Sequence, residues 1–105
     1  MTRLVGLAAT WLVLQGTAAH RGQSEVIQQD QQFSQTEITI HRSDSVYFHN
    51  NDTVVHYVFS TSPGNRFRLK PQKPGTSALV VFAAEGTVHV RCALHPDMSL
   101  LVNVE

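Results

Sequence analysis

The 105-residue sequence has little of two things that small proteins often depend on, namely cysteine and an excess of one charge. Cys92 is the single cysteine, so an internal disulfide is excluded. Eight Lys and Arg residues balance eight Asp and Glu residues. That balance argues against nucleic acid or an anionic membrane surface as the main partner. Beyond residue 19 the sequence also lacks an internal repeat and a long 3.6-residue periodicity, so no sizeable helix is expected.

Long apolar runs are scarce too, and the one at the amino terminus is short. Arg3 precedes an apolar run at residues 4–14, and small residues follow at 17–19. This order predicts a cleavable secretory signal peptide at residues 1–19. The run falls short of the roughly 20 apolar residues that a membrane span requires, and a retained signal anchor is the alternative. We therefore expect an exported protein, periplasmic in a bacterium, whose domain comprises residues 20–105.

So small a domain has a marginal core unless a disulfide, a metal or a partner stabilises it. With one cysteine there is no internal disulfide, and an unpaired thiol in an oxidising compartment needs an explanation. A bound metal would both protect the thiol and stabilise the fold.

The rest of the sequence alternates between apolar and polar residues in short runs that turn residues separate, a pattern typical of β-strands. Seven or eight such strands predict an all-β fold, a Greek-key β-sandwich of two packed sheets. The apolar run at residues 77–83 is expected at a central position in its sheet. The expected strands are residues 24–29, 37–41, 45–50, 54–60, 66–69, 77–83, 87–92 and 100–104.

The candidate functional residues surround the cysteine, in the segment RCALHPDM at residues 91–98. Cys92 is in phase with Val88 and Val90, so its side chain is expected to point into the core. The alternative is that Cys92 is a small buried hydrophobic residue without a further role.

Two further metal-binding side chains follow the cysteine closely. His95 and Met98 come three and six residues after it. Pro96 prevents easy continuation of the strand, which places both on a loop that can fold back over the thiol. A fourth ligand must come from elsewhere, and His56 is the candidate because it is in phase with an apolar strand that begins after a turn.

This set of donors favours one metal over the others. Thiolate and thioether are soft ligands, and zinc sites seldom use methionine. Two histidines, one cysteine and a weak methionine describe the blue-copper electron-transfer centre. The four ligands leave no open position for a substrate, which indicates an electron carrier and not an enzyme.

The segments that contain these residues resemble the cupredoxin family of small blue-copper proteins. CALHPDM resembles the short Cys-x-x-His-x-x-Met ligand loop of the amicyanin type. NNDTVVH, at residues 50–56, resembles the family's Asn-x-(Asp/Glu)-x-x-x-His segment, and AAEGTVHVRC resembles its approach to the cysteine. The similarity spans residues 24–105 and extends to plastocyanin-like proteins labelled for methylamine utilisation.

The resemblance implies a role for each matching residue. It implies one copper ion held by His56, Cys92, His95 and Met98, with Asn50 behind the ligands, where its side chain ties the two ligand-bearing segments together near the sulfur. It also implies that the ring of His95 is the electron port, in an apolar patch with Leu94 and Pro96. The implied partners of a monomeric carrier are redox proteins, such as an exported dehydrogenase or a c-type cytochrome.

Three residues depart from the family pattern. Val55 stands where the family often has proline, Ser43 where a turn glycine is usual, and Asp97 where relatives often have an aromatic residue or glycine. Two other functions stay open: a periplasmic copper-binding and delivery protein, and a fold of this type that has lost copper. Clusters of exposed methionine or histidine are the usual ligands of delivery proteins, and beyond residue 19 this chain has one methionine.

Overall fold

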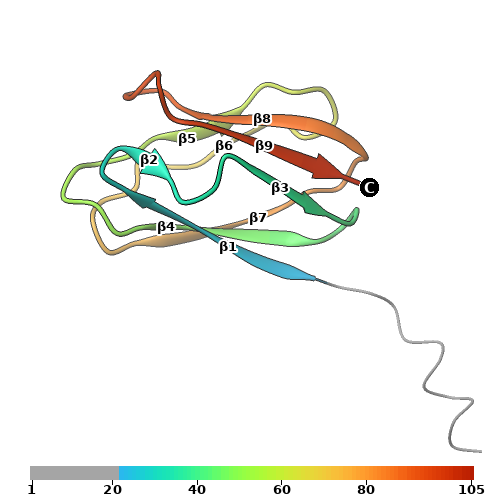
Figure 1. The fold of residues 1–105 in the computed structure, drawn as a ribbon, viewed down its shortest axis with the longest axis horizontal. Helices are drawn as coiled ribbons and strands as arrows, with labels where there is room; N and C mark the ends of the chain where they lie inside the picture. Colours follow the sequence, from blue (N-terminus) through green and yellow to red (C-terminus); the bar gives the residue numbers. More distant parts are fainter. Residues whose placement is uncertain (1–21) are drawn as a thin grey trace, which may run out of the picture.

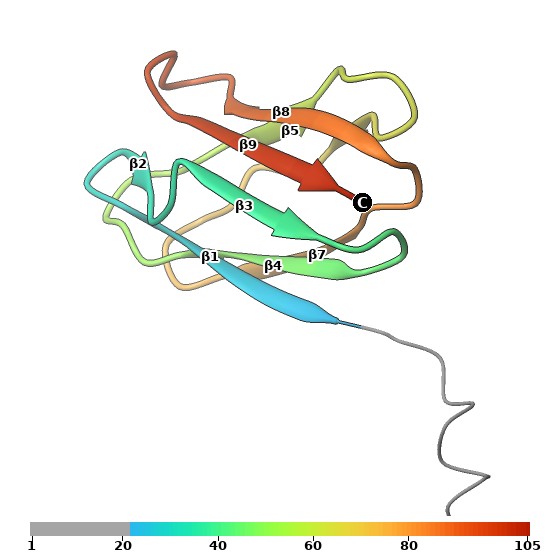
Figure 2. The same cartoon turned by 45° about the vertical axis from the view of Figure 1, so that its right-hand side comes forward.

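A computed structural model describes residues 22–105, so the predicted signal peptide at residues 1–19 lies outside the described residues. No helix within the described range is long and apolar enough to cross a membrane. The described chain forms nine strands in two layers (Figures 1 and 2). They are β1 (Gln23–Gln29), β2 (Gln32–Phe33), β3 (Glu37–Ile40), β4 (Ser45–Asn50), β5 (Val58–Ser60), β6 (Phe67–Arg68), β7 (Ser77–Val81), β8 (Gly86–Cys92) and β9 (Ser99–Val104).

One sheet has the strand order β2-β1-β4-β7 and the other β3-β9-β8-β5-β6. Both sheets are mixed, because β1 pairs with β4 and β3 pairs with β9 in parallel, whereas the other pairs are antiparallel. The predicted all-β sandwich is thus confirmed. The ninth strand is β2, a strand of only two residues that pairs with β1 and was not among the expected strands.

The inner faces of the two sheets pack against each other through strand residues that alternate between buried and exposed. In β8, for example, Val88, Val90 and Cys92 are buried while the residues between them are exposed. Four phenylalanines cross this core in edge-to-face or tilted contacts with ring centroids 5.9–6.2 Å apart: Phe33, Phe48, Phe67 and Phe82. Fully burying a side chain such as Phe48 contributes roughly 1.5–3 kcal/mol.

Two expectations about individual strands were wrong. The run at 77–83 is not central, because β7 lies at the edge of its sheet and exposes Leu79 and Val81. The strand expected at 54–60 begins only at Val58. His56 instead forms an isolated antiparallel bridge with Gln72, since the chain there leaves the sheet to pair with the loop that follows β6.

The strand ends bring two segments, far apart in sequence, to the same end of the sandwich. The loop from β8 to β9, residues 93–98, lies at the end where β1 turns into β2 and β4 leads toward β5 (Figures 1 and 2). Val58 of β5 pairs directly with Cys92 of β8. This pairing places the segment just before β5, which contains His56, beside the last residue of β8.

Candidate metal centre

Cys92 ends β8 with its thiol on the inner face, as the strand parity predicts. Its side chain is 2% exposed. The backbone N–H of Tyr57 donates to Cys92 Sγ (3.2 Å), and the N–H of Ala93 donates to Tyr57 O (2.9 Å). The N–H of Tyr57 thus lies where it can hydrogen-bond to a sulfur that is bound to a metal. The sulfur is therefore buried, oriented and supplied with a donor that suits a metal-bound state.

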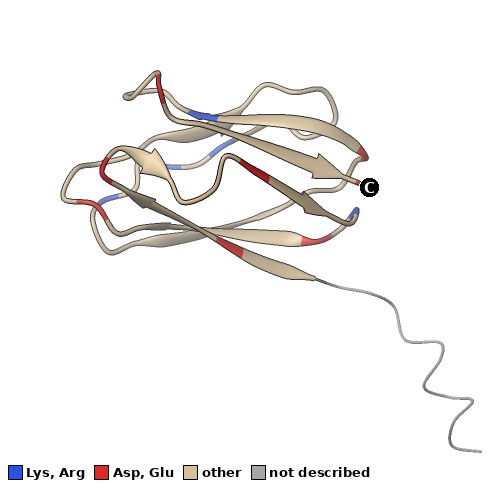
Figure 3. Ribbon diagram, viewed as in Figure 1, with Lys and Arg blue, Asp and Glu red and all other residues tan. Residues whose placement is uncertain are grey.

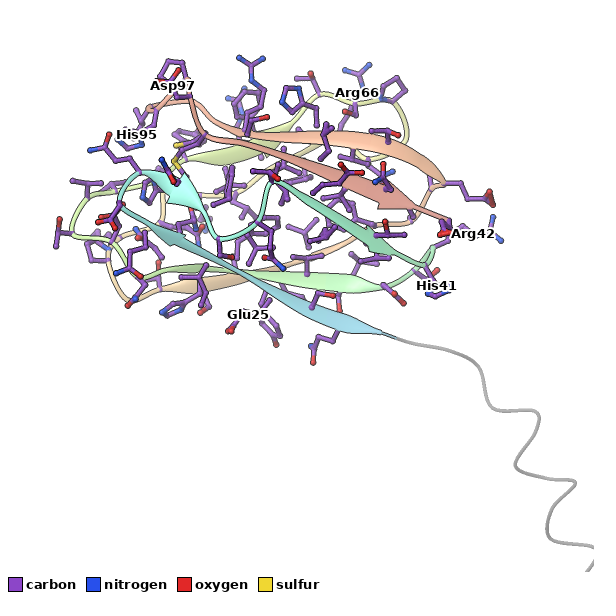
Figure 4. The ribbon with its side chains drawn as sticks, in the orientation of Figure 1. Glu25, His41, Arg42, Arg66, His95 and Asp97 are labelled. Atoms are coloured by element: carbon purple, nitrogen blue, oxygen red, sulfur yellow. The ribbon has the colours of Figure 1, made fainter. Side chains whose placement is uncertain are left out.

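The loop after Cys92 folds back through one tight turn. The N–H of Met98 donates to His95 O (3.0 Å), which closes the turn around Pro96. His95 is partly exposed and Met98 is 1% exposed. Figure 4 shows His95 and the exposed Asp97 close together at this end of the molecule. The turn thus directs the thioether inward and leaves the imidazole of His95 at the boundary with solvent.

His56 is fully buried and is held at both its backbone and its ring. Its N–H donates to Gln72 O (3.1 Å), and its carbonyl accepts from the N–H of Gln72 (2.8 Å). Its Nε2 lies 2.9 Å from Asp52 Oδ2. Because an ionised carboxylate only accepts hydrogen bonds, Nε2 carries the hydrogen. In the neutral imidazole, Nδ1 then presents its lone pair.

Three donor atoms converge where these segments meet. His56 Nδ1 lies 3.1 Å from His95 Nδ1, and Cys92 Sγ lies 3.5 Å from His95 Nδ1 and 3.8 Å from His56 Nδ1. Donors bound to one first-row metal at about 2.0–2.3 Å stand roughly 3–4 Å from one another. Three lone-pair atoms this close also repel unless a cation or a proton lies between them. The donor set and its spacing fit a metal ion.

Comparisons with known proteins bear on the fold. No family model and no curated protein matches the sequence. Among solved structures, the chain is similar to a novel purple cupredoxin from Nitrosopumilus maritimus, with a TM-score of 0.69, 23% identity, and 78% of this chain and 99% of that chain covered. It is also similar to amicyanin from Paracoccus versutus, with a TM-score of 0.71, 24% identity, and coverage of 78% and 80%. This is a cupredoxin fold.

The cupredoxin fold also occurs as part of larger proteins. A copper-containing nitrite reductase from Thermus scotoductus matches with a TM-score of 0.72 and 18% identity over 78% of this chain, but over only 22% of its own length. The fold by itself is therefore compatible with a carrier or with one domain of an enzyme. The choice between them depends on the site.

The structure assigns Asn50 a different connection from the predicted one. Asn50 is fully buried, and its Nδ2 donates to Val54 O (2.9 Å) and to Gln72 O (2.8 Å), while its Oδ1 accepts from the N–H of Asp52 (2.8 Å). All three partners lie on the His56 side of the centre. Asn50 therefore shapes the turn before His56 instead of tying that segment to the cysteine loop.

Asp52 contacts the cluster through His56, and the sequence analysis did not single it out. The N–H of Gln31 donates to its Oδ2 (2.8 Å), and this hydrogen bond is the largest cause that lowers the pKa of Asp52 from 3.8 to about 2. His56 and the N–H of Thr53 lower the pKa further, against the opposing effect of burial. The Asn-x-(Asp/Glu) element of the motif contains this position, and its spacing of four residues before His56 was the available signal.

The remaining described histidines do not join the cluster. His49 Nδ1 contacts Ser77 Oγ (2.6 Å), His89 Nε2 contacts Ser99 Oγ (2.7 Å), and His41 Nδ1 lies 3.8 Å from Asp44 Oδ2. All three lie on the outward phase of their strands or in a turn. Among residues 22–105, only His56, Cys92 and His95 form a group of three or more such side chains with metal-like spacing.

The surface around His95 combines apolar and polar groups. Leu94 is 53% exposed and Pro96 is exposed, as the predicted apolar patch requires. A groove of about 620 Å³ runs beside them, between the ligand loop and the β1–β2 turn, and Asp30 and Asp97 are among its lining residues. Charges of both signs are interspersed over the described fold (Figure 3). Four basic residues lie close together in the sequence between residues 66 and 73. The first of them, Arg66, is well separated from His95 (Figure 4).

Proposed function

We propose that the protein is an exported type 1 copper protein that carries one electron at a time between redox partners. The observation that carries the proposal is the convergence of His56, Cys92 and His95 within 3.1–3.8 Å, next to the buried Met98. Copper bound by this donor set supplies a Cu(II)/Cu(I) couple that takes up and returns one electron.

The chain's own residues account for the properties that a carrier needs. His56, Cys92 and Met98 are 0–2% exposed, so water and small substrates have no direct access to their donor atoms. Asp52 and the N–H of Tyr57 orient an imidazole and a sulfur by hydrogen bonds that the protein itself supplies. Ligands held in this way move little when the charge of the ion changes, which favours electron transfer over substrate chemistry.

His95 is the route by which an electron leaves or enters. It is the partly exposed member of the cluster, and Leu94 and Pro96 surround it with apolar surface. We infer that transient partners dock here, because small contacts of less than about 1,200 Å² suit fast association and release. An exported dehydrogenase or a c-type cytochrome is the kind of partner that a monomeric periplasmic carrier would serve.

The visible spectrum of the purified mature domain with added Cu(II) tests the proposal. An intense thiolate-to-copper band is expected, and Cys92→Ser abolishes it. His49→Gln is the matched control, because His49 lies on the outer face, and this variant keeps the band. If the unaltered domain shows no such band, the proposal is wrong.

The alternative function, copper delivery, predicts a different behaviour on reduction. A delivery protein releases its metal to an acceptor, whereas a carrier keeps copper in both oxidation states. The buried cluster favours the carrier, since exchange of the ion requires the ligand loop to open. Sequencing the amino terminus of the protein recovered from the periplasm tests the export prediction, and a chain that starts near His20 supports it.

A further inference from the structure

A buried glutamine that the proposed site does not use lies near the end of β1. Gln28 is fully buried, and its Nε2 donates to Gln72 Oε1 (2.9 Å). Gln72 Nε2 donates in turn to Phe48 O (2.9 Å). Because Nε2 of Gln72 is committed to a carbonyl, the oxygen of that amide must face Gln28, and Gln28 must act as the donor. The partners therefore fix the orientation of both amides.

The other end of the Gln28 amide is unsatisfied. Its Oε1 is buried and has no hydrogen-bond partner within the part of the chain that the structure describes. A buried acceptor without a partner destabilises a fold, and an apolar side chain of similar size avoids that cost. Methionine would remove this oxygen, but it would also leave Gln72 Oε1 without its donor. What methionine would lose is the hydrogen bond to Gln72.

Gln72 in turn contacts His56, the buried histidine of the candidate metal centre. Its backbone N–H and C=O make both hydrogen bonds of the bridge to His56 (2.8 and 3.1 Å), and the same carbonyl accepts from Asn50 Nδ2 (2.8 Å). Gln72 is 4% exposed, so no water competes for these groups. The position of Gln72 therefore sets the backbone of His56, and with it the direction in which Nδ1 points.

We propose that Gln28 is a positioning residue for the metal centre, which acts through Gln72 on the backbone of His56. The inference rests on the proposed function in one respect, because the positioned imidazole is the proposed copper ligand. The register of β1 with β4, which sets Gln28 beside Asn50, makes the arrangement part of the sheet. The position of His56 is therefore set by contacts within the protein itself.

Gln28→Met in the metal-free mature domain tests the proposal directly. The measurement is amide hydrogen exchange by NMR at His56 and Gln72, whose N–H groups form the bridge. We expect exchange at both to be roughly fivefold faster, the factor for loss of one buried neutral hydrogen bond. The melting temperature is expected to change little, because the variant removes the unsatisfied Gln28 Oε1 but leaves Gln72 Oε1 without its donor. Unchanged exchange at both amides would overturn the proposal.

Val26→Ala is the matched control, since Val26 is a fully buried residue of the same strand without a polar contact to the site. The cavity lowers the melting temperature, but exchange at His56 and Gln72 should change only as much as it does at other core amides. If Gln28→Met behaves in the same way, with all core amides accelerated together and the melting temperature lowered, Gln28 is only a core residue and the proposal fails.

Addition of Cu(II) separates this inference from the proposed function. In Gln28→Met, the thiolate-to-copper band should shift in wavelength or intensity, while Val26→Ala should leave it unchanged. A band identical in Gln28→Met and the unaltered protein would contradict the positioning role. If the unaltered protein gives no band, the copper proposal fails, and the exchange data from the metal-free protein still decide whether Gln28 positions His56.

Discussion

At the scale of single residues, Asp52 determines which nitrogen of His56 faces the cluster. Its carboxylate accepts from Nε2 (2.9 Å) and from the N–H of Gln31 (2.8 Å), so one side chain joins the β1–β2 turn to the imidazole. Removing the carboxylate frees the ring to rotate and leaves the Gln31 N–H without this acceptor. Asp52 thus links the local turn structure to the chemistry of the site.

The lowered pKa of Asp52 predicts how its contribution depends on pH. Since the pKa falls from 3.8 to about 2 in the folded state, the stabilisation is fully present above pH 3.8 and is lost as the pH falls toward 2. The difference in unfolding free energy between the metal-free protein and Asp52→Asn should therefore shrink between about pH 4 and pH 2. Urea unfolding at several pH values measures it, and a constant difference would contradict the prediction.

Asp97 gives a second prediction at this scale. It is an exposed carboxylate in the ligand loop, between His95 and Met98. A negative charge there favours the more positive, oxidised ion, so Asp97→Asn should raise the reduction potential. Because water screens an exposed charge, we expect a shift of only ~10–20 mV. Voltammetry of both proteins measures it, with Glu85→Gln as a distant control; an unchanged or lower value would count against this role of Asp97.

At the scale of elements, the sequence predicts the orientation of side chains along a strand and the strand's end, because these depend on local periodicity. It does not predict the order of strands in a sheet, which depends on pairing between distant segments. The alternation along β8 correctly predicted that Cys92 lies on the inner face. Pro96 correctly predicted that the strand ends before the loop. The same reasoning could not place β7 at an edge, because the order of strands depends on which segments pair across the whole chain. Nor could it find Gln28 and Gln72, whose contact spans 44 residues.

The turn between β3 and β4 contains a residue with a strained backbone conformation. Ser43, at the position where the family has glycine, adopts φ 76°, in the left-handed region. That conformation costs an L-residue about 1–2 kcal/mol, and glycine avoids this cost. Glycine also loses more conformational entropy on folding, which offsets part of the stabilisation. Ser43→Gly should therefore raise the unfolding free energy by about 0.5–1 kcal/mol in urea denaturation. Ser45→Gly, in extended β4, should lower it; a loss of stability in Ser43→Gly would refute the argument.

At the scale of the whole molecule, a small sandwich without a disulfide gains stability from whatever binds its folded state. The cluster joins the β8–β9 loop to the segment before β5, so an ion there cross-links two distant parts of the chain. Metal at 1,000 times its Kd would add about 4 kcal/mol. Calorimetry should therefore show a melting temperature at least several degrees higher with Cu(II), and no comparable rise in Cys92→Ser. An equal rise in both proteins would place the binding elsewhere.

Redox cycling of the copper-loaded protein tests the central claim most directly. The absorbance of the thiolate-to-copper band is followed while the protein is reduced, passed through a desalting column and reoxidised. An electron carrier keeps its ion, so we predict that the band disappears on reduction and returns in full, with one electron exchanged per copper. Loss of copper on the column after reduction, or failure of the band to return, would contradict the account.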